Sequence, residues 1–183
     1  MKLALIALAL ALALAVPVGA TTPGAAALMK ELEGVYSHEF HNKIVVAGKL
    51  SDSSQAEDVI DIMRYDDQHA FVRASVHVGK GHRCSVQGVA AFENNAFVYR
   101  DPEPPLSGTQ CTLRIARVGD KLVLDDRVKP ATASTCSASC GARSSLGQYS
   151  IDLRKKTALG NPARIKGSKE YAKAVKAFED SRR

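Results

Sequence analysis

Tryptophan is absent from this 183-residue chain, and aromatic residues make up only 5% of it. The usual hydrolase signatures are missing too, since no G-x-S-x-G and no H-E-x-x-H stretch occurs. No glycine-rich phosphate loop precedes a predicted helix. Because no set of catalytic residue types assembles into a recognisable site, the sequence favours a non-catalytic protein and implies no cofactor.

The first twenty residues have the pattern of a secretory signal peptide. Lys2 precedes an unbroken apolar run over residues 3–16, Pro17 ends the run, and Val18-Gly19-Ala20 offers small residues for cleavage. The run is shorter than the roughly 20 residues that a membrane span needs. We therefore expect cleavage near Ala20, no transmembrane span afterwards, and a soluble protein in the periplasm or outside the cell. Because no cysteine lies near the cleavage site, we do not expect a lipid anchor.

The four cysteines predict two disulfides, because the expected compartment is oxidising. Cys84 and Cys111 each begin a predicted strand at the same end of the β meander, so we predict a Cys84–Cys111 bridge. Cys136 and Cys140 then close a tight local loop, and the two other connectivities remain open. A redox-active Cys136–Cys140 pair is the alternative, but the spacing is not C-x-x-C and no βαβ pattern surrounds it.

Short alternations of apolar and polar residues run through the middle of the chain, most clearly over residues 70–78. Asn94-Asn95 and Gly119-Asp120 predict hairpin turns. We expect a bend or bulge at Asn42-Lys43 and a polar loop over 49–57. About eight short strands predict a mainly β fold, a single antiparallel barrel or sandwich over residues 21–153. The barrel is favoured because closure removes exposed strand edges.

Each end of the mature chain carries a predicted short helix. Residues 23–33 form either a helix or a frayed terminus. The net charge of +6 is concentrated in residues 143–183, and Ser168 caps a helix with a stripe of Tyr171, Val175 and Phe178. We expect this stripe to dock the basic 154–183 segment on the β domain. The alternative is a cationic face, with Lys155 and Lys156 at its start, that meets an anionic envelope component.

Two histidine groups could be drawn as metal ligands, namely His38-x-x-His41 and the set His77, His82 and Cys84. On a strand, residues three apart point to opposite faces, and neither group has zinc-site spacing. We therefore interpret these histidines as polar-face residues and expect no metal. Nucleic acid is a poor partner, because aromatic residues are not interleaved with the basic ones and the compartment is wrong.

Binding residues concentrate on loops that a rigid scaffold holds in place. The proline-rich loop over residues 101–110, with Pro104 and Pro105, and the segment 136–143, with Arg143, are therefore the expected contacts. The expected partner is an unidentified protein or an anionic envelope component. A lipocalin-like carrier of a small apolar ligand is the alternative, and a thiol-redox or hydrolytic enzyme is the third hypothesis.

One set of short motifs carries a resemblance to a known group of proteins. The stretch Cys136-Ser-Ala-Ser-Cys140-Gly141-Ala142-Arg143, read with Gly34-Val35-Tyr36, Glu57-Asp58-Val59 and Ser168-Lys-Glu-Tyr171, resembles uncharacterised exported proteobacterial proteins. Ser144 stands where that group usually has glycine. The resemblance implies export and paired cysteines but no mechanism. A small disulfide-bonded barrel is also distantly similar in architecture to the C-type lysozyme inhibitors and to lipocalins, although Cys111 occupies the position of the signature tyrosine of the lysozyme inhibitors.

Overall fold

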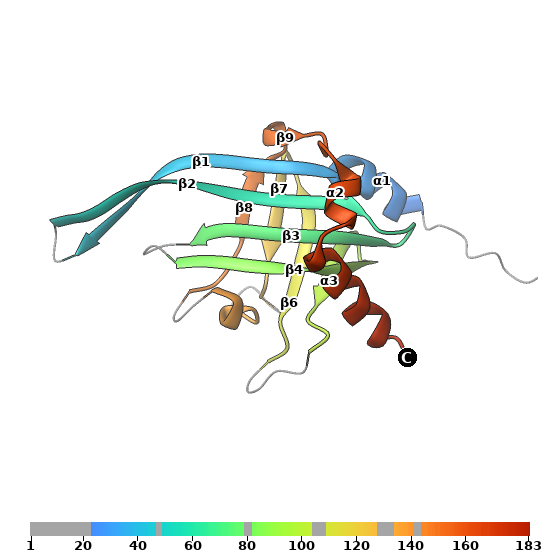
Figure 1. Ribbon diagram of the computed structural model, residues 1–183. Helices are drawn as coiled ribbons and strands as arrows, with labels where there is room; N and C mark the ends of the chain where they lie inside the picture. The colour runs from blue at the N-terminus through green and yellow to red at the C-terminus, as the bar shows by residue number, and fades with distance from the viewer. Residues whose placement is uncertain (1–22, 47–48, 79–81, 104–108, 128–133, 141–143) are drawn as a thin grey trace, which may run out of the picture.

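The computed structural model describes residues 23–46, 49–78, 82–103, 109–127, 134–140 and 144–183. Within them the fold is mainly β, and nine antiparallel strands curl into a nearly closed barrel, which confirms the predicted class (Figure 1). The predicted leader, residues 1–20, lies outside the described residues. Among the residues that are described, no helix combines the length and the apolar character needed to cross a bilayer.

The chain follows a simple meander in which each strand pairs with the next. The strands are β1 (Gly34–Val46), β2 (Lys49–Arg64), β3 (His69–Val78), β4 (His82–Glu93), β5 (Ala96–Arg100), β6 (Thr112–Val118), β7 (Lys121–Asp125), β8 (Tyr149–Asp152) and β9 (Lys156–Thr157). The helices are α1 (Pro23–Leu32), α2 (Pro162–Lys166) and α3 (Lys169–Asp180), with the 3-10 turns η1 (Ser137–Cys140) and η2 (Leu153–Lys155).

The two edges of the sheet are joined by a single turn of chain. β8 ends the meander, η2 follows directly, and β9 pairs with β1 at Val35 and Tyr36. The Leu153 amide donates a hydrogen bond of 2.8 Å to the carbonyl of Asp120, which fixes η2 against the β6–β7 turn. The sheet thus extends past residue 153, the expected end of the β domain, and the short β9 brings the two edges together.

The tight turns form where the local sequence predicts them. Asn94 and Asn95 both have positive φ, 48° and 56°, the geometry of a type I′ hairpin. Gly119 has φ of +61° at the first central position of the β6–β7 turn, as a type II′ turn requires.

The interior of the barrel is filled by side chains from the strands and from α1. Leu28, Met29 and Leu32 of α1 are buried in the main core, so the helical alternative for residues 23–33 is confirmed. The buried Tyr36 hydroxyl donates to the carbonyl of Leu32 at 2.9 Å, which joins the end of α1 to β1. Aromatic and aliphatic strand residues, Phe97 among them, complete the same cluster.

β1 and β2 are much longer than the other strands and project beyond them as a two-stranded arm (Figure 1). Pairing of β2 with β3 begins only at Val59, opposite Ser75, whereas β2 pairs with β1 from Lys49 onward. The prediction of a polar loop over 49–57 was wrong. The local pattern lacks apolar alternation because this part of the hairpin is not packed on the barrel. The expected bend at Asn42-Lys43 is also absent, and the register shifts instead between Ile44 and Val45.

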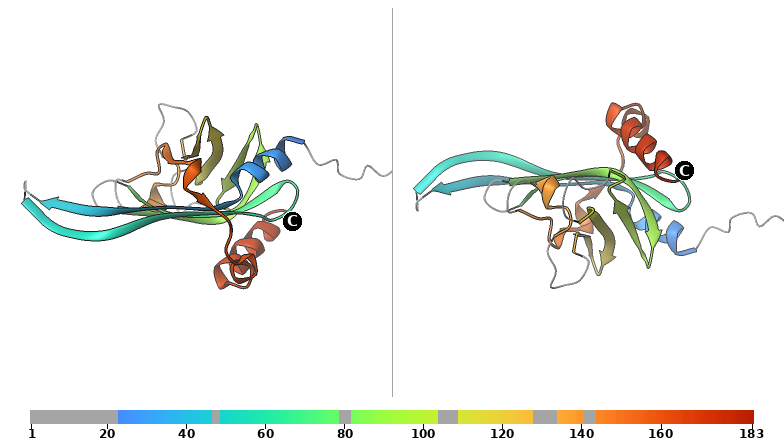
Figure 2. Two further views of the ribbon diagram at one scale, coloured as in Figure 1. Left: turned by 90° about the horizontal axis from the view of Figure 1, so that it is seen from above. Right: turned by 90° about the horizontal axis from the view of Figure 1, so that it is seen from below.

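The basic C-terminal segment docks on the barrel through its apolar stripe. Figure 2 shows α1 and α3 on opposite faces of the layer formed by β1 to β4. The Tyr171 and Phe71 rings lie 4.9 Å apart, as do the Phe178 and His69 rings, and Ala174 is buried between the helix and the sheet. The Ser168 hydroxyl accepts from the Tyr171 amide at 3.1 Å, which confirms the predicted cap.

Candidate functional site

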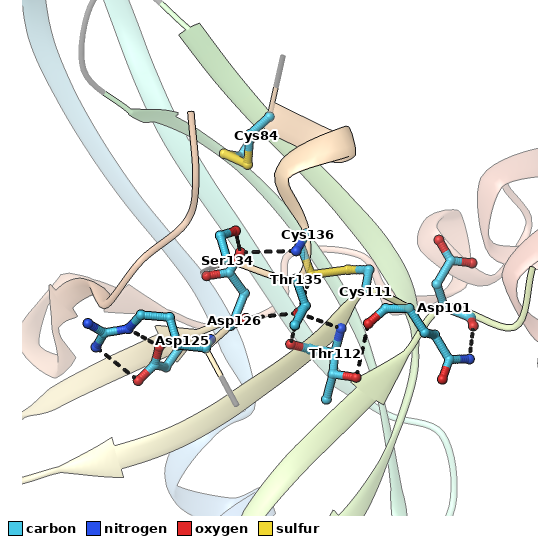
Figure 3. Close-up of a disulfide and its surroundings, with 12 residues drawn as sticks. Cys84, Asp101, Cys111, Thr112, Asp125, Asp126, Ser134, Thr135 and Cys136 are labelled. Carbon is cyan, nitrogen blue, oxygen red and sulfur yellow. Dashed lines mark hydrogen bonds and ion pairs between the residues drawn. A yellow bond between two sulfur atoms is a disulfide. The ribbon is translucent and has the colours of Figure 1, made fainter. Parts of the chain in front are cut away.

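The disulfide pairing differs from the predicted one. Cys84 is bonded to Cys140 and Cys111 to Cys136, so the predicted Cys84–Cys111 and Cys136–Cys140 bridges are both wrong (Figure 3). The hairpin register does place Cys84 opposite residue 105, but β5 ends at Arg100 and never reaches that position. The segment that carries η1 lies beside this part of β4 instead, and Cys140 bonds to Cys84 there.

A fully buried carboxylate organises the same segment. Asp126, with 0% exposure, accepts hydrogen bonds from the amides of Cys136 at 3.2 Å and Gly147 at 3.0 Å, and from the Ser134 hydroxyl. Its own carbonyl accepts from the amide and the hydroxyl of Thr135 (Figure 3). Since a buried charge is tolerated only when it is hydrogen-bonded, these contacts explain how Asp126 is accommodated in the interior. They also fix the chain that leads into η1.

β5 separates from β4 for a local reason. Asp101 accepts a hydrogen bond of 3.0 Å from the Glu103 amide across Pro102, a turn that directs the chain away from the sheet. Pro102 has no amide hydrogen with which to continue the ladder. The Asp101 amide donates to the carbonyl of Cys111 at 2.9 Å, which holds the departing chain against the start of β6.

The separation of β4 from β5 leaves a cleft in the side of the barrel, which we call the β4 cleft. It has a volume of about 230 Å³ and is lined by one run of β4, residues 85–89. The turn at Asp101–Glu103 and Ser139 of η1 contribute further lining, and Ala177 and Phe178 of α3 close another side. Two loop segments and the C-terminal helix thus converge on one strand.

Tyr99 lines the β4 cleft, and its ring packs directly on Gly88. A Cβ added to Gly88 would lie 2.1 Å from Cε2 of Tyr99, so only glycine allows this ring to pack on β4. The ring is 7% exposed. Burial raises the pKa of the Tyr99 hydroxyl, and the Asp101 and Glu103 carboxylates raise it further, so this group stays a neutral donor.

Gly88→Ala should lower the free energy of unfolding by about 2 kcal/mol, because the added methyl group overpacks the Tyr99 ring. Gly160→Ala is the matched control, since no atom lies within 4 Å of the Cβ that it would add. Urea unfolding followed by circular dichroism measures both. Equal stability of the two variants would show that Tyr99 does not pack on Gly88.

The charged side chains around the β4 cleft balance one another. Arg100 binds Glu93 through two hydrogen bonds, the longer of 2.7 Å, and hydrogen bonding to Arg100 lowers the pKa of Glu93. Lys173 of α3 lies 3.9 Å from Glu103, and both side chains are largely exposed, so this pair adds little stability. The lining therefore presents no strong field of either sign.

The structure brings together only part of the predicted site. Pro104, Pro105 and Arg143 lie outside the described residues, although the loops that carry them border the β4 cleft at Glu103 and Ser139. Lys155 is exposed on η2, and Lys156 donates a hydrogen bond of 2.6 Å to the carbonyl of Glu31 at the end of α1. Neither lysine lines the cleft.

A second polar cluster lies where β2 and β3 diverge. The Asp58 carboxylate, 4% exposed, accepts from the His77 amide at 2.6 Å and from the Tyr149 hydroxyl at 2.7 Å. It also lies 3.0 Å from Nδ1 of His77. The hydrogen bond from the His77 amide to Asp58 replaces a ladder hydrogen bond that β2 would supply if β2 and β3 continued as a pair. The Asp58 contacts thus join β2, β3 and β8 at this point.

The histidine groups considered as metal ligands do not converge. Cys84 is oxidised in its disulfide, and His77 is engaged by Asp58. Over the part of the chain that the structure describes, no three His, Cys, Asp or Glu side chains lie close enough to hold a metal ion.

Sequence reasoning missed two elements of the β4 cleft, the open edge of β4 and the face of α3. The signal for the first was present, since Pro102 follows the Asn94-Asn95 turn too closely for β5 to match the length of β4. The position of α3 beside the cleft depends on how the C-terminal segment crosses the sheet. Comparison with known proteins adds no further assignment, because no family model, no curated protein and no solved structure matches this chain.

Proposed function

We propose that this chain is an exported, non-catalytic protein of the bacterial envelope that binds a segment of a partner in the β4 cleft. The observation that carries the proposal is the convergence of both loop segments and α3 on residues 85–89 of β4. Ligand sites are concave and few, and contact residues gather on loops that a scaffold holds. Two disulfides hold this scaffold, which suits an oxidising compartment.

The carrier hypothesis receives less support. A lipocalin-like carrier needs a cavity inside the barrel, whereas the main core contains tightly buried side chains such as Tyr36, Phe97 and Leu113. The β4 cleft opens through the side of the barrel and has polar as well as apolar lining, which suits a segment of a larger molecule better than a small apolar ligand.

Filling the β4 cleft should abolish partner binding without unfolding the protein. Ala177→Trp places an indole in the cleft, and Ala172→Trp is the control, because Ala172 is exposed on the same helix and does not line the cleft. A photo-crosslinking residue at position 139 reports binding in the exporting cell. We expect discrete crosslinked species that fall at least about tenfold with Ala177→Trp, a loss of about 1.4 kcal/mol, and persist with Ala172→Trp.

Two results would contradict the proposal. One is a crosslinking pattern from position 139 that Ala177→Trp leaves unchanged. The other is the absence of any crosslinked species from the protein in its own compartment.

A further inference from the structure

The open part of β4 presents backbone hydrogen-bonding groups to the β4 cleft in a regular pattern. The Phe92 amide donates to the carbonyl of Gln68 at 2.8 Å, which shows that even-numbered residues of β4 bond toward β3. In the β4–β5 hairpin, Glu93 pairs with Ala96 across a two-residue turn, so odd-numbered residues bond toward β5. The amides and carbonyls of Ser85 and Gln87 therefore face the side that β5 has left, whereas the Val89 carbonyl still belongs to the last β4–β5 pairing.

These groups lack a strand partner in the described structure. Pairing of β4 with β5 stops at Ala90, opposite Tyr99, so no described strand pairs with Ser85 or Gln87 on this side. Residues 85–89 nevertheless line a defined cleft instead of an open surface. An unpaired strand edge is a template for another strand, and here α3, η1 and the Asp101–Glu103 turn restrict access to a single added segment.

The side chains of the β4 cleft indicate what kind of segment fits. Residues on an added strand would point alternately to the two faces of the sheet. One face offers Ala177 and Phe178 of α3, and the other offers Tyr99. The charges of Arg100, Asp101, Glu103 and Lys173 sum to zero, so neither a strongly acidic nor a strongly basic occupant is favoured.

We propose that the occupant of the β4 cleft is an extended, uncharged peptide segment of another protein, which adds to β4 as a strand alongside Ser85 and Gln87. This inference rests on the proposed function and specifies its partner. The backbone of the segment pairs with Ser85 and Gln87 of β4, and its alternate apolar side chains contact α3 and Tyr99. An anionic polymer would bind without this backbone pairing.

A random nonapeptide library displayed on phage, selected against the full mature chain, supplies the probe. Selected peptides should be uncharged at their centre and should bind wild-type protein but not Ala177→Trp. In the best of them, N-methylation of successive central amides should weaken binding at alternate positions only, by roughly tenfold at each. Dependence on every position, or on none, would overturn the inference.

Gln87→Pro tests the same pairing from the protein side. The substitution removes an amide that faces the cleft and leaves the β3–β4 ladder intact, because proline is accepted at an edge whose amide is not bonded. We expect at least about tenfold weaker peptide binding, whereas Gln87→Ala, which keeps the amide, should retain most of the affinity. Circular dichroism and thermal unfolding check that the proline variant is folded.

The outcomes separate this inference from the proposed function. Loss of binding with Ala177→Trp but not with Gln87→Pro would leave the β4 cleft as a binding site and refute strand addition. A library that yields no peptide dependent on the cleft would refute strand addition as well, while the crosslinking experiment would still test the proposed function. Binding of an anionic polymer, or self-association lost with Ala177→Trp, would identify a different occupant.

Discussion

Replacement of Cys84 and Cys140 together by alanine is expected to lower the free energy of unfolding by about 4 kcal/mol, because this bridge closes the longer loop in the unfolded chain. The two residues are 56 apart in sequence, against 25 for Cys111 and Cys136. A loss of this size is a large part of the roughly 5–15 kcal/mol that stabilises a typical domain. Urea unfolding of the wild-type protein and of the Cys84→Ala/Cys140→Ala variant measures this loss.

Thiol titration provides the control for this experiment. The Cys84→Ala/Cys140→Ala variant should contain no free thiol, because Cys111 and Cys136 remain bonded to each other. The Cys84→Ala/Cys111→Ala variant should expose two thiols on unfolding, because it removes one partner from each bridge. No free thiol in the second variant, with two in the first, would contradict the connectivity. Peptide binding should weaken in the first variant, since Cys140 fixes η1 at the end of the β4 cleft.

Asp126→Ala should lower the free energy of unfolding by about 3 kcal/mol or more, because it leaves buried donors without an acceptor. The amides of Cys136 and Gly147 and the hydroxyl of Ser134 all donate to this carboxylate, which is completely buried. The Cys136 amide is buried and cannot turn to solvent without moving the chain that leads into η1.

Asp125→Ala is the matched control for Asp126→Ala. Asp125 is the preceding residue, is partly exposed and pairs with Arg127 at 3.0 Å, so its loss should cost less than about 1 kcal/mol. Denaturant unfolding monitored by circular dichroism compares the two variants. Equal losses would show that the Asp126 hydrogen bonds do not stabilise the fold.

Much of the local structure could be predicted from the sequence, because local interactions produce it. Asn94-Asn95 adopts a type I′ turn since both residues tolerate positive φ. The Ser168 cap and the apolar stripe at Tyr171 and Phe178 specify α3 and its docking face within a few turns of helix. The β class follows likewise from alternation, which is a property of neighbouring residues.

The β4 cleft was predictable only in part. The sequence indicated the two loop segments, and Asp101–Glu103 and Ser139 from those segments do line the cleft. The open edge of β4 results from the difference in length between β4 and β5.

The arm formed by β1 and β2 was missed because residues 49–57 carry no apolar alternation, and only their partner β1 shows that they are a strand.

The sequence by itself determined the turns, the caps, the alternating faces and the presence of four cysteines, since each depends on residues close together in the chain. Only the tertiary structure decided which cysteines pair, because β5 leaves β4 after Arg100 and η1 takes the position beside Cys84. The same departure opens the β4 cleft, and α3 crosses there from the far end of the chain. Contacts between residues distant in sequence depend on how the whole barrel closes, and no local pattern records that closure.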